Sequence, residues 1–353
     1  MIWKTMIGIC LLVGVLATTA RGEITVEPWT PIYDGVSHAT GEADGAEPRL
    51  QKVNAFRVNL MVAGIDLYTT PSNGGDPDET TAQTASDFLI SSGVKVAVNA
   101  NFYSPTPPAP WPGSNYKDLQ GLAISQGNLV SDQETNVGAN RGQVFVATQD
   151  NDAWFDVTAP DPIDLTGIYT AVCGDARLLL NGNINVGAGG EAHARTAIGL
   201  SQNGTTLIMI TIDGDQIGYS EGATYFEAAE WLARFGAYNG INVDGGGSTT
   251  MVRSDDQGGA VVLNSPKGAG WPIPDQPGQR KNGNHLGVFA SPLPILGDLN
   301  CDDAFNQQDI GPFVAALLYQ EAYGYECLLN GDFDESGTVE GSDIQGFVDA
   351  LVD

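Results

Sequence analysis

Apolar residues gather in short runs that alternate or continue in the manner of β-strands. Turn-forming clusters of Gly, Pro and Asn separate these runs. Helical spacing is clear in only two stretches of the main part of the chain, residues 80–91 and 224–235. The runs that predict strands span residues 55–62, 94–98, 143–147 and 205–212. The pattern predicts an α+β fold: a β-rich mixed domain with few helices.

Two apolar runs end in an aspartate and are predicted to be buried strands. Residues 207–212 lead into Asp213, and residues 241–243 lead into Asp244, which is followed directly by three glycines. A rigid strand end fixes the position of a carboxylate, and consecutive glycines allow several backbone N–H groups to converge on one anion. We therefore expect these strands to be neighbours, with both aspartates facing a common hollow.

These features also have structural interpretations. An aspartate before glycine can cap a tight turn. Thr224 and Glu227 form the Thr-x-x-Glu pattern of a helix capping box, a role with the same weight as a catalytic one. The occurrence of several such features in one short stretch, with Arg195 just upstream, favours a functional site.

An ordered series of motifs resembles the phosphodiester glycosidase family. The series comprises NANFY at 99–103, GLAISQGN at 121–128, RTAIG at 195–199, Asp213-Gly214, Ser220-x-Gly222, Glu227 and DGGGST at 244–249, followed by Arg280 and Asn284. It covers most of residues 95–290. The resemblance implies a hydrolase that cleaves the bond between the anomeric carbon of a sugar and a phosphate.

The chemistry of that bond agrees with the residues present. Phosphate is a good leaving group, so the enzyme mainly needs charge stabilisation on the phosphate and a carboxylate near the anomeric carbon. We assign Asp244 to that carboxylate, Asp213 to its acid/base partner or a sugar ligand, and Glu227 to a third catalytic candidate. The expected substrate- and phosphate-binding residues are Arg195, Gly245, Gly246, Gly247, Ser248, Thr249, Asn99, Ser220 and Arg280.

The acidic loop that begins at Gly297 is repeated from Gly331, and each copy continues into an apolar helix. Oxygen-bearing side chains stand at positions one, three, five, nine and twelve, the spacing that encloses calcium. The expected side-chain ligands are Asp298, Asn300, Asp302, Asn306 and Asp309 in the first copy, and Asp332, Asp334, Ser336, Glu340 and Asp343 in the second. Position seven, Ala304 or Thr338, would contribute its backbone carbonyl. Because one helix follows each loop and the twelfth ligand is Asp, the pair resembles a small all-α dockerin-type module. The resemblance implies calcium as a cofactor and a cohesin-like receptor as a candidate partner.

The ends of the chain and its composition suggest an exported protein. We expect a signal peptide at 1–22, a phosphodiester glycosidase domain at 23–290, a linker at 291–296 and the calcium-loop module at 297–353. No later segment is long enough to span a bilayer, which predicts no transmembrane anchor. The net charge of −28 argues against a nucleic-acid partner. Export permits a disulfide, for which Cys301 and Cys327 are the expected pair.

Three hypotheses remain open at this point. The first is a secreted, periplasmic or cell-surface glycosidase acting on sugar-1-phosphodiesters or an envelope glycan. The second is a non-catalytic binder of phosphate-bearing glycans, which would need Arg195 and the glycine turn but not both aspartates. The third is a structural component of a surface assembly, in which the C-terminal module matters most.

Overall fold

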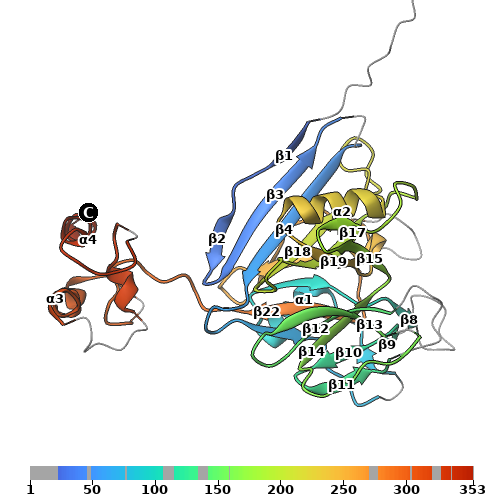
Figure 1. The fold of residues 1–353 in the computed structure, drawn as a ribbon, viewed down its shortest axis with the longest axis horizontal. Coiled ribbons are helices and arrows are strands. Elements are labelled where there is room, and N and C mark those ends of the chain that lie inside the picture. The colour runs from blue at the N-terminus through green and yellow to red at the C-terminus, as the bar shows by residue number, and fades with distance from the viewer. Residues whose placement is uncertain are drawn as a thin grey trace, which may run out of the picture.

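A computed structural model gives the fold of the chain, with a β-rich body and a small C-terminal unit joined by an extended segment (Figure 1). It describes residues 23–45, 49–75, 78–105, 115–133, 142–158, 160–269, 277–302, 304–319, 327–334 and 336–352. The predicted signal peptide at 1–22 lies outside the described residues. No helix in the described ranges is long and apolar enough to cross a membrane.

The largest sheet in the described part of the chain has nine antiparallel strands. Its order is β1 (Ile24–Val26), β3 (Val36–Ala43), β4 (Gln51–Asn59), β18 (Thr206–Ile212), β17 (Arg195–Leu200), β19 (Asn239–Asn242), β15 (Ala176–Leu180) and β16 (Asn183–Ile184), and β2 (Thr30–Tyr33) pairs with β3. Alternate residues of β18 face opposite layers: Leu207 and Met209 enter the central core, whereas Ile208 and Ile210 enter the core beneath a helix. Both faces of this sheet are therefore covered.

That covering helix is α2 (Tyr225–Arg234), which lies across β15, β17 and β18 (Figure 1). Thr224 and Glu227 form the predicted capping box at its start. Trp231 is buried on its inner face and donates its indole N–H to Gln51 Oε1 at 2.6 Å. The prediction of a helix at 224–235 is confirmed.

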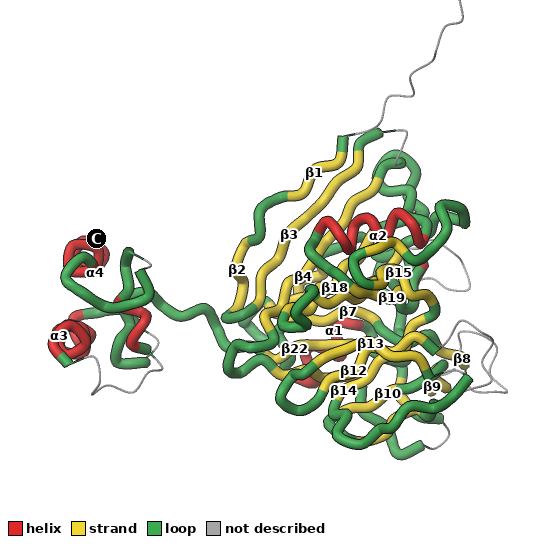
Figure 2. Tube along the Cα trace, in the orientation of Figure 1, coloured by secondary structure: helices red, strands yellow, loops and turns green. Residues whose placement is uncertain are grey.

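Three smaller sheets complete the body (Figure 2). The first contains β21 (Ala260–Val262), β20 (Met251–Ser254), β7 (Val96–Asn99), β22 (His285–Phe289) and β5 (Asp66–Thr69). The second contains β11 (Asn128–Ser131), β10 (Ala123–Ser125), β14 (Thr170–Gly174), β12 (Gln143–Ala147) and β13 (Ala153–Val157). The third contains β6 (Thr80–Thr81), β9 (Tyr116–Leu119) and β8 (Tyr103–Pro105). The central core draws residues from the nine-stranded sheet and from both five-stranded sheets.

The first predicted helix begins later than its pattern suggests. The pattern predicts a helix over 80–91, but α1 spans Ala85–Ser92, and residues 80–81 form β6, which pairs with β9. Thr84 is the N-cap, and its side chain accepts a hydrogen bond from the N–H of Asp87. The cap and the strand pairing together fix the start of this helix.

The C-terminal unit has its own apolar core. It contains η2 (Gln307–Asp309), α3 (Ile310–Leu318), η3 (Leu328–Gly331) and α4 (Asp343–Val352). The rings of Phe313 on α3 and Phe347 on α4 stack with centroids 3.9 Å apart. The predicted Cys301–Cys327 disulfide is present, and residues 291–296 are exposed between the unit and the body.

Candidate active site

Three central strands of the nine-stranded sheet have neighbouring ends: β18 and β19 end where β17 begins. Strand β17 lies between β18 and β19, so the expectation that the two aspartate-bearing strands are direct neighbours is wrong. The register pairs Arg195 at the start of β17 with Ile212 at the end of β18. The register also pairs Ala197 with Asn242, so Asp244, two residues after Asn242, comes opposite Arg195. Asp213 and Asp244 therefore leave the sheet at the same end of the strands, on either side of Arg195.

A bridging asparagine connects Asp213 to the turn that follows Asp244. Asn264 donates from its amide to Asp213 Oδ1 at 2.9 Å and to the carbonyl of Thr249 at 3.1 Å. Thr249 itself is buried, and its N–H bonds to the carbonyl of Gly246. The two predicted acidic residues therefore belong to one connected polar structure.

Asp213 is a buried carboxylate with several donors. Its side chain also accepts hydrogen bonds from the N–H of Ser265 at 2.9 and 3.0 Å and from the hydroxyl of Tyr219 at 3.4 Å. Burial raises the pKa of Asp213 above the ordinary aspartate value, because it outweighs the opposing effect of these hydrogen bonds. Such a carboxyl group keeps its proton to a higher pH than an exposed aspartate, as a proton donor requires.

Asp244 is partly exposed and its backbone is held firmly. Its N–H donates to the carbonyl of Ala100 at 2.9 Å, and its own carbonyl accepts a hydrogen bond from the amide of Asn99 at 2.6 Å. Its Oδ1 accepts the N–H of Gly245 at 2.9 Å. Burial and then the charge of Asp244 raise the pKa of Tyr103, so this carboxylate and the phenol share one electrostatic environment.

The glycine turn satisfies much of its own hydrogen-bonding capacity. Gly245 N–H binds the Asp244 carboxylate, and Gly246 N–H binds the carbonyl of Ala194 at 2.7 Å. Gly246–Ser248 form a short 3-10 helix, η1, in which Gly246 has a φ of 58°. A side chain at Gly245 would meet Ala194, and one at Gly247 would meet the Arg280 guanidinium. The glycines thus permit close packing within the protein, in addition to any approach to a ligand.

Two predicted sugar-binding residues serve as internal braces. Asn99 is fully buried; its Oδ1 accepts hydrogen bonds from Thr196 Oγ1 at 2.7 Å and Thr250 N at 3.1 Å. Ser220 is also buried; its hydroxyl donates to the carbonyl of Asp213 at 2.6 Å and accepts from Lys52 N. The structure therefore places both side chains behind the site, where they hold the backbones of Asp244 and Asp213.

The predicted cation Arg195 is bound to backbone carbonyls. Its guanidinium donates to Ala223 at 2.9 Å and Glu191 at 2.9 Å, and lies over the ring of Tyr225 at 4.4 Å. Glu227 caps α2 through the N–H of Thr224 and pairs with Arg49 at 3.5 Å. These contacts give Glu227 the structural role that its spacing allowed.

A basic and aromatic group lies beside the glycine turn. Arg280 donates to Ser248 Oγ at 3.4 Å. Lys117 is only 1% exposed and its ammonium lies 5.4 Å from the centre of the Tyr103 ring. Burial and then the charge of Arg280 lower the pKa of Lys117, so two cations are held close to each other. An anion bound here would relieve their repulsion.

The sequence predicted Arg280 and Ser248 but missed Lys117 and Tyr103. Tyr103 is the last residue of the NANFY motif, which gave a usable signal, whereas nothing around Lys117 distinguished it from a surface lysine. Asp175 was also missed: its carboxylate accepts hydrogen bonds from Tyr225 at 2.7 Å and Asn242 at 2.9 Å. Its position at the start of β15 places it on the same sheet edge as Arg195.

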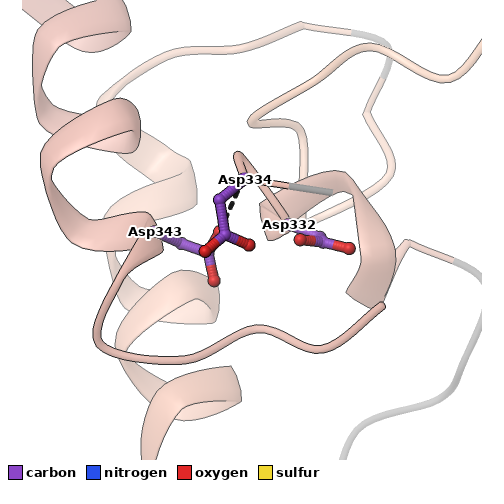
Figure 3. Close-up of side chains that lie close together, drawn as sticks. All are labelled: Asp332, Asp334 and Asp343. Carbon is purple, nitrogen blue, oxygen red and sulfur yellow. Dashed lines mark hydrogen bonds between the residues drawn. The ribbon is translucent and has the colours of Figure 1, made fainter. Parts of the chain in front are cut away.

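The two C-terminal loops share one hydrogen-bonding pattern. Asp343 accepts hydrogen bonds from the N–H groups of Phe333, Asp334 and Glu340. Asp309 accepts the same three bonds in the first loop, from Leu299, Asn300 and Asn306. In the second loop, Asp332, Asp334 and Asp343 each place a carboxylate oxygen within 4.8 Å of the others (Figure 3). Two oxygens that bind one calcium ion at about 2.4 Å lie at most about 4.8 Å apart, so this spacing fits a single calcium ion.

The fold and the site define a β-rich domain that gathers acidic and basic side chains at one end of the strands of its main sheet. A model of the phosphodiester glycosidase family matches residues 92–289, more than half of the chain. The chain belongs to this family, as its motifs predicted. No curated protein matches it significantly.

Three solved structures are similar to the chain to different degrees. The catalytic domain of zebrafish N-acetylglucosamine-1-phosphodiester alpha-N-acetylglucosaminidase, auto-inhibited by its pro-peptide, is 17% identical with a TM-score of 0.53, and the match covers 77% of this chain and 89% of that one. A hypothetical protein from Synechocystis is 16% identical with a TM-score of 0.47; the match covers 75% of this chain but only 64% of that one. A Burkholderia pseudomallei protein described as a putative exported protein is 14% identical with a TM-score of 0.48, and the match covers 68% of this chain and 74% of that one. Of these three, the zebrafish domain, with its TM-score above 0.5, supports the fold assignment.

Proposed function

We propose that the chain is a secreted glycosidase that hydrolyses the C1–O–phosphate bond of a sugar-1-phosphodiester. The observation that supports it most strongly is the placement of Asp213 and Asp244 at one sheet edge, with Arg280 and Lys117 beside the turn that follows Asp244. Family membership adds to this argument. A carboxylate next to an anion-binding pair matches the charge distribution of a sugar phosphate at the moment its bond breaks.

The residues divide the reaction between them. Arg280 and Lys117 bind the phosphate, and the guanidinium can engage two oxygens at once. As the C1–O bond breaks, its electron pair leaves with the phosphate, while Asp244 stabilises positive charge at the anomeric carbon. Water forms the new bond to C1 and gives up one proton to the carboxylate of Asp244. Asp213, which keeps its proton to a higher pH, donates that proton to the departing phosphate oxygen. Arg195 and Asn99 hold the strand edge in place.

Asp244→Asn tests the catalytic assignment. It removes the charge with little change of volume, and we expect turnover of a panel of sugar-1-phosphodiesters, followed as released reducing sugar, to fall by roughly 10²- to 10⁴-fold. Asp150→Asn, at an exposed position away from the sheet edge, is the matched control and should retain activity. Wild-type protein that binds these substrates without turning over any of them would instead favour a glycan-binding module.

We further propose that residues 297–353 form a dockerin-type calcium-binding module that docks to a cohesin-like receptor. Both loops use the hydrogen-bonding pattern described above, and the second has a carboxylate spacing that fits calcium. Asp332, Asp334, Ser336 and Asp343 would hold the ion, which would offset the charge of a segment without Lys, Arg or His.

A repeated apolar stripe supports the docking role. On α3, Ile310 and Val314 are 43% and 46% exposed, and on α4 the equivalent Ile344 and Val348 are 46% and 45% exposed. These residues stand four apart on their helices and thus lie on one face. Duplicated exposed apolar side chains in a small acidic unit indicate a protein-binding surface.

Calcium titration of the full chain tests the ion site. We expect calcium to raise the unfolding temperature of the C-terminal unit and a chelator to reverse this rise. Asp332→Asn should weaken the effect of calcium, and Asp349→Asn, at an exposed position of α4, is the control. Docking is tested by measuring binding to a recombinant cohesin with and without Val314→Asp and Val348→Asp together. Identical melting curves in calcium and chelator would contradict the ion site, and cohesin binding unchanged by the double substitution would contradict the docking surface.

A further inference from the structure

A groove lies at the opposite end of the strands that carry the candidate active site. Strands β15 and β17 end there at Leu180 and Leu200, and β19 begins there at Asn239. The groove has a volume of about 380 Å³ and also borders β13 and the turn from Ser201 to Gly204. Because β17 is six residues long, roughly 17 Å separate this groove from Arg195.

The lining combines an aromatic surface with side-chain amides. Trp154, on the edge strand β13, borders the groove and is 38% exposed. The amides come from Asn181, Gln202, Asn203 and Asn239. A pyranose ring presents C–H groups on its faces and hydroxyls on its rim; an indole packs against the former, and an amide both donates to and accepts from the latter.

Two of the amides are held in fixed orientations. Asn239 Oδ1 accepts the N–H of Asn181 at 2.9 Å, and Asn203 Oδ1 accepts the hydroxyl of Ser201 at 2.7 Å. Each carbonyl oxygen is thus engaged by the protein, which leaves the Nδ2 groups as the donors for a ligand. Donors fixed before binding lose little entropy when a ligand arrives.

The charges near the groove favour a neutral ligand. Arg177, its only lining cation among the described residues, donates to Gln143 Oε1 at 2.9 Å and to the carbonyl of Asp156 at 3.2 Å, and packs over Phe155. It is therefore committed to the protein. The chain as a whole carries a net charge of −28, which repels polyanions.

We propose that this groove is a second carbohydrate-binding site, separate from the candidate active site, that takes one or two rings of a neutral oligosaccharide. Its volume lies near the lower end of the roughly 300–1,000 Å³ that is usual for small-ligand sites. The site would hold a glycan-rich surface or polymer against the protein while the other end of the sheet remains open to a sugar phosphate. It does not depend on the catalytic role of Asp244.

Calorimetric titration of the full chain with cellotetraose, xylotetraose, mannotetraose, maltotetraose and chitotetraose tests this site. We expect at least one of them to bind, at least tenfold more weakly to Trp154→Ala and several-fold more weakly to Gln202→Ala, which changes an exposed residue of the groove lining. Tyr319→Ala, another exposed aromatic position, is the matched control and should bind normally.

Two results would overturn the proposal: no binding of any oligosaccharide at concentrations up to about 10 mM, or binding that both groove variants retain. Binding lost in Asp244→Asn but kept in Trp154→Ala would place the sugar at the other end of the sheet and also overturn it. Since these ligands carry no phosphate and no turnover is measured, failure of the phosphodiesterase assay leaves this test intact.

Discussion

Removal of the Asn99 side chain should destabilise the fold and disrupt the site together. This fully buried amide binds the carbonyl of Asp244, the hydroxyl of Thr196 and the N–H of Thr250. Asn99→Ala leaves these buried groups without their partner, and each such loss costs about 1–3 kcal/mol. These three losses together should lower the free energy of unfolding by about 3–9 kcal/mol.

The consequence for function follows from the position of Asp244. Without the 2.6 Å bond from Asn99, the backbone that carries this carboxylate is free to shift, and a displacement of about 1 Å at a reacting group can cost about 10²-fold in rate. We therefore expect kcat to fall by about this factor with a smaller change in KM. A residue that bound the sugar directly would show the larger change in KM.

Calorimetric unfolding and steady-state kinetics on the same preparations check both expectations. For a domain of this size the loss corresponds to a decrease in Tm of at least roughly 6 °C. Asn128→Ala is the matched control: Asn128 is exposed, and its side chain donates to the nearby carbonyls of Ser125 and Gln126. This substitution should change stability by less than about 0.5 kcal/mol. Our reasoning is refuted if Asn99→Ala unfolds at the wild-type temperature.

Three further predictions concern the fold. Burial lowers the pKa of His285 to about 3, below its unfolded value of about 6.5, so the native state should lose about 1.4 kcal/mol of stability per pH unit as the pH falls from 6.5 toward 3. Denaturant titrations should show that the stability of His285→Gln lacks this pH dependence. Equal pH dependence of stability in the wild type and the variant would contradict the prediction. A Cβ at Gly214 would stand 2.2 Å from the backbone nitrogen of Ala194, so Gly214→Ala should express as an unstable protein. Gly187→Ala is the control: a Cβ there would meet open space, and this variant should melt at the wild-type temperature. Equal melting temperatures of the two variants would count against the packing argument. The Cys301–Cys327 disulfide closes a loop across 26 positions, so its reduction should destabilise the C-terminal unit by about 3 kcal/mol without altering the melting of the body. If the melting curve shows no such destabilisation, the loop is constrained by other contacts.

Local features of the chain were readable without the fold. The run at 143–147 is β12 with the expected bounds, and the other three predicted runs each overlap a strand: β4, β7 and β18. The capping box of α2 and the disulfide pair were likewise predicted. Each depends on contacts between residues close in sequence, or on spacing within one small unit, so the pattern alone carries the information.

The candidate site shows where such reasoning stops. The sequence identified Asp213 and Asp244 as strand-end carboxylates but gave the wrong strand order, because pairing across a sheet depends on contacts between distant segments. It also placed Asn99 among the substrate-binding residues, whereas the partners of its side chain are residues that meet it only in the folded protein. A polar residue in a motif has the same letter whether it faces a ligand or a neighbouring strand.

Periodicity and the order of motifs along the chain were enough to predict a β-rich phosphodiester glycosidase domain followed by two repeated acidic loops. The folded structure was needed to show that β17 separates the two aspartate strands and that Lys117 lies beside Tyr103 near Arg280. It also placed a groove at the far end of the same strands. These features arise from side chains brought together by packing across three sheets, which no local pattern encodes.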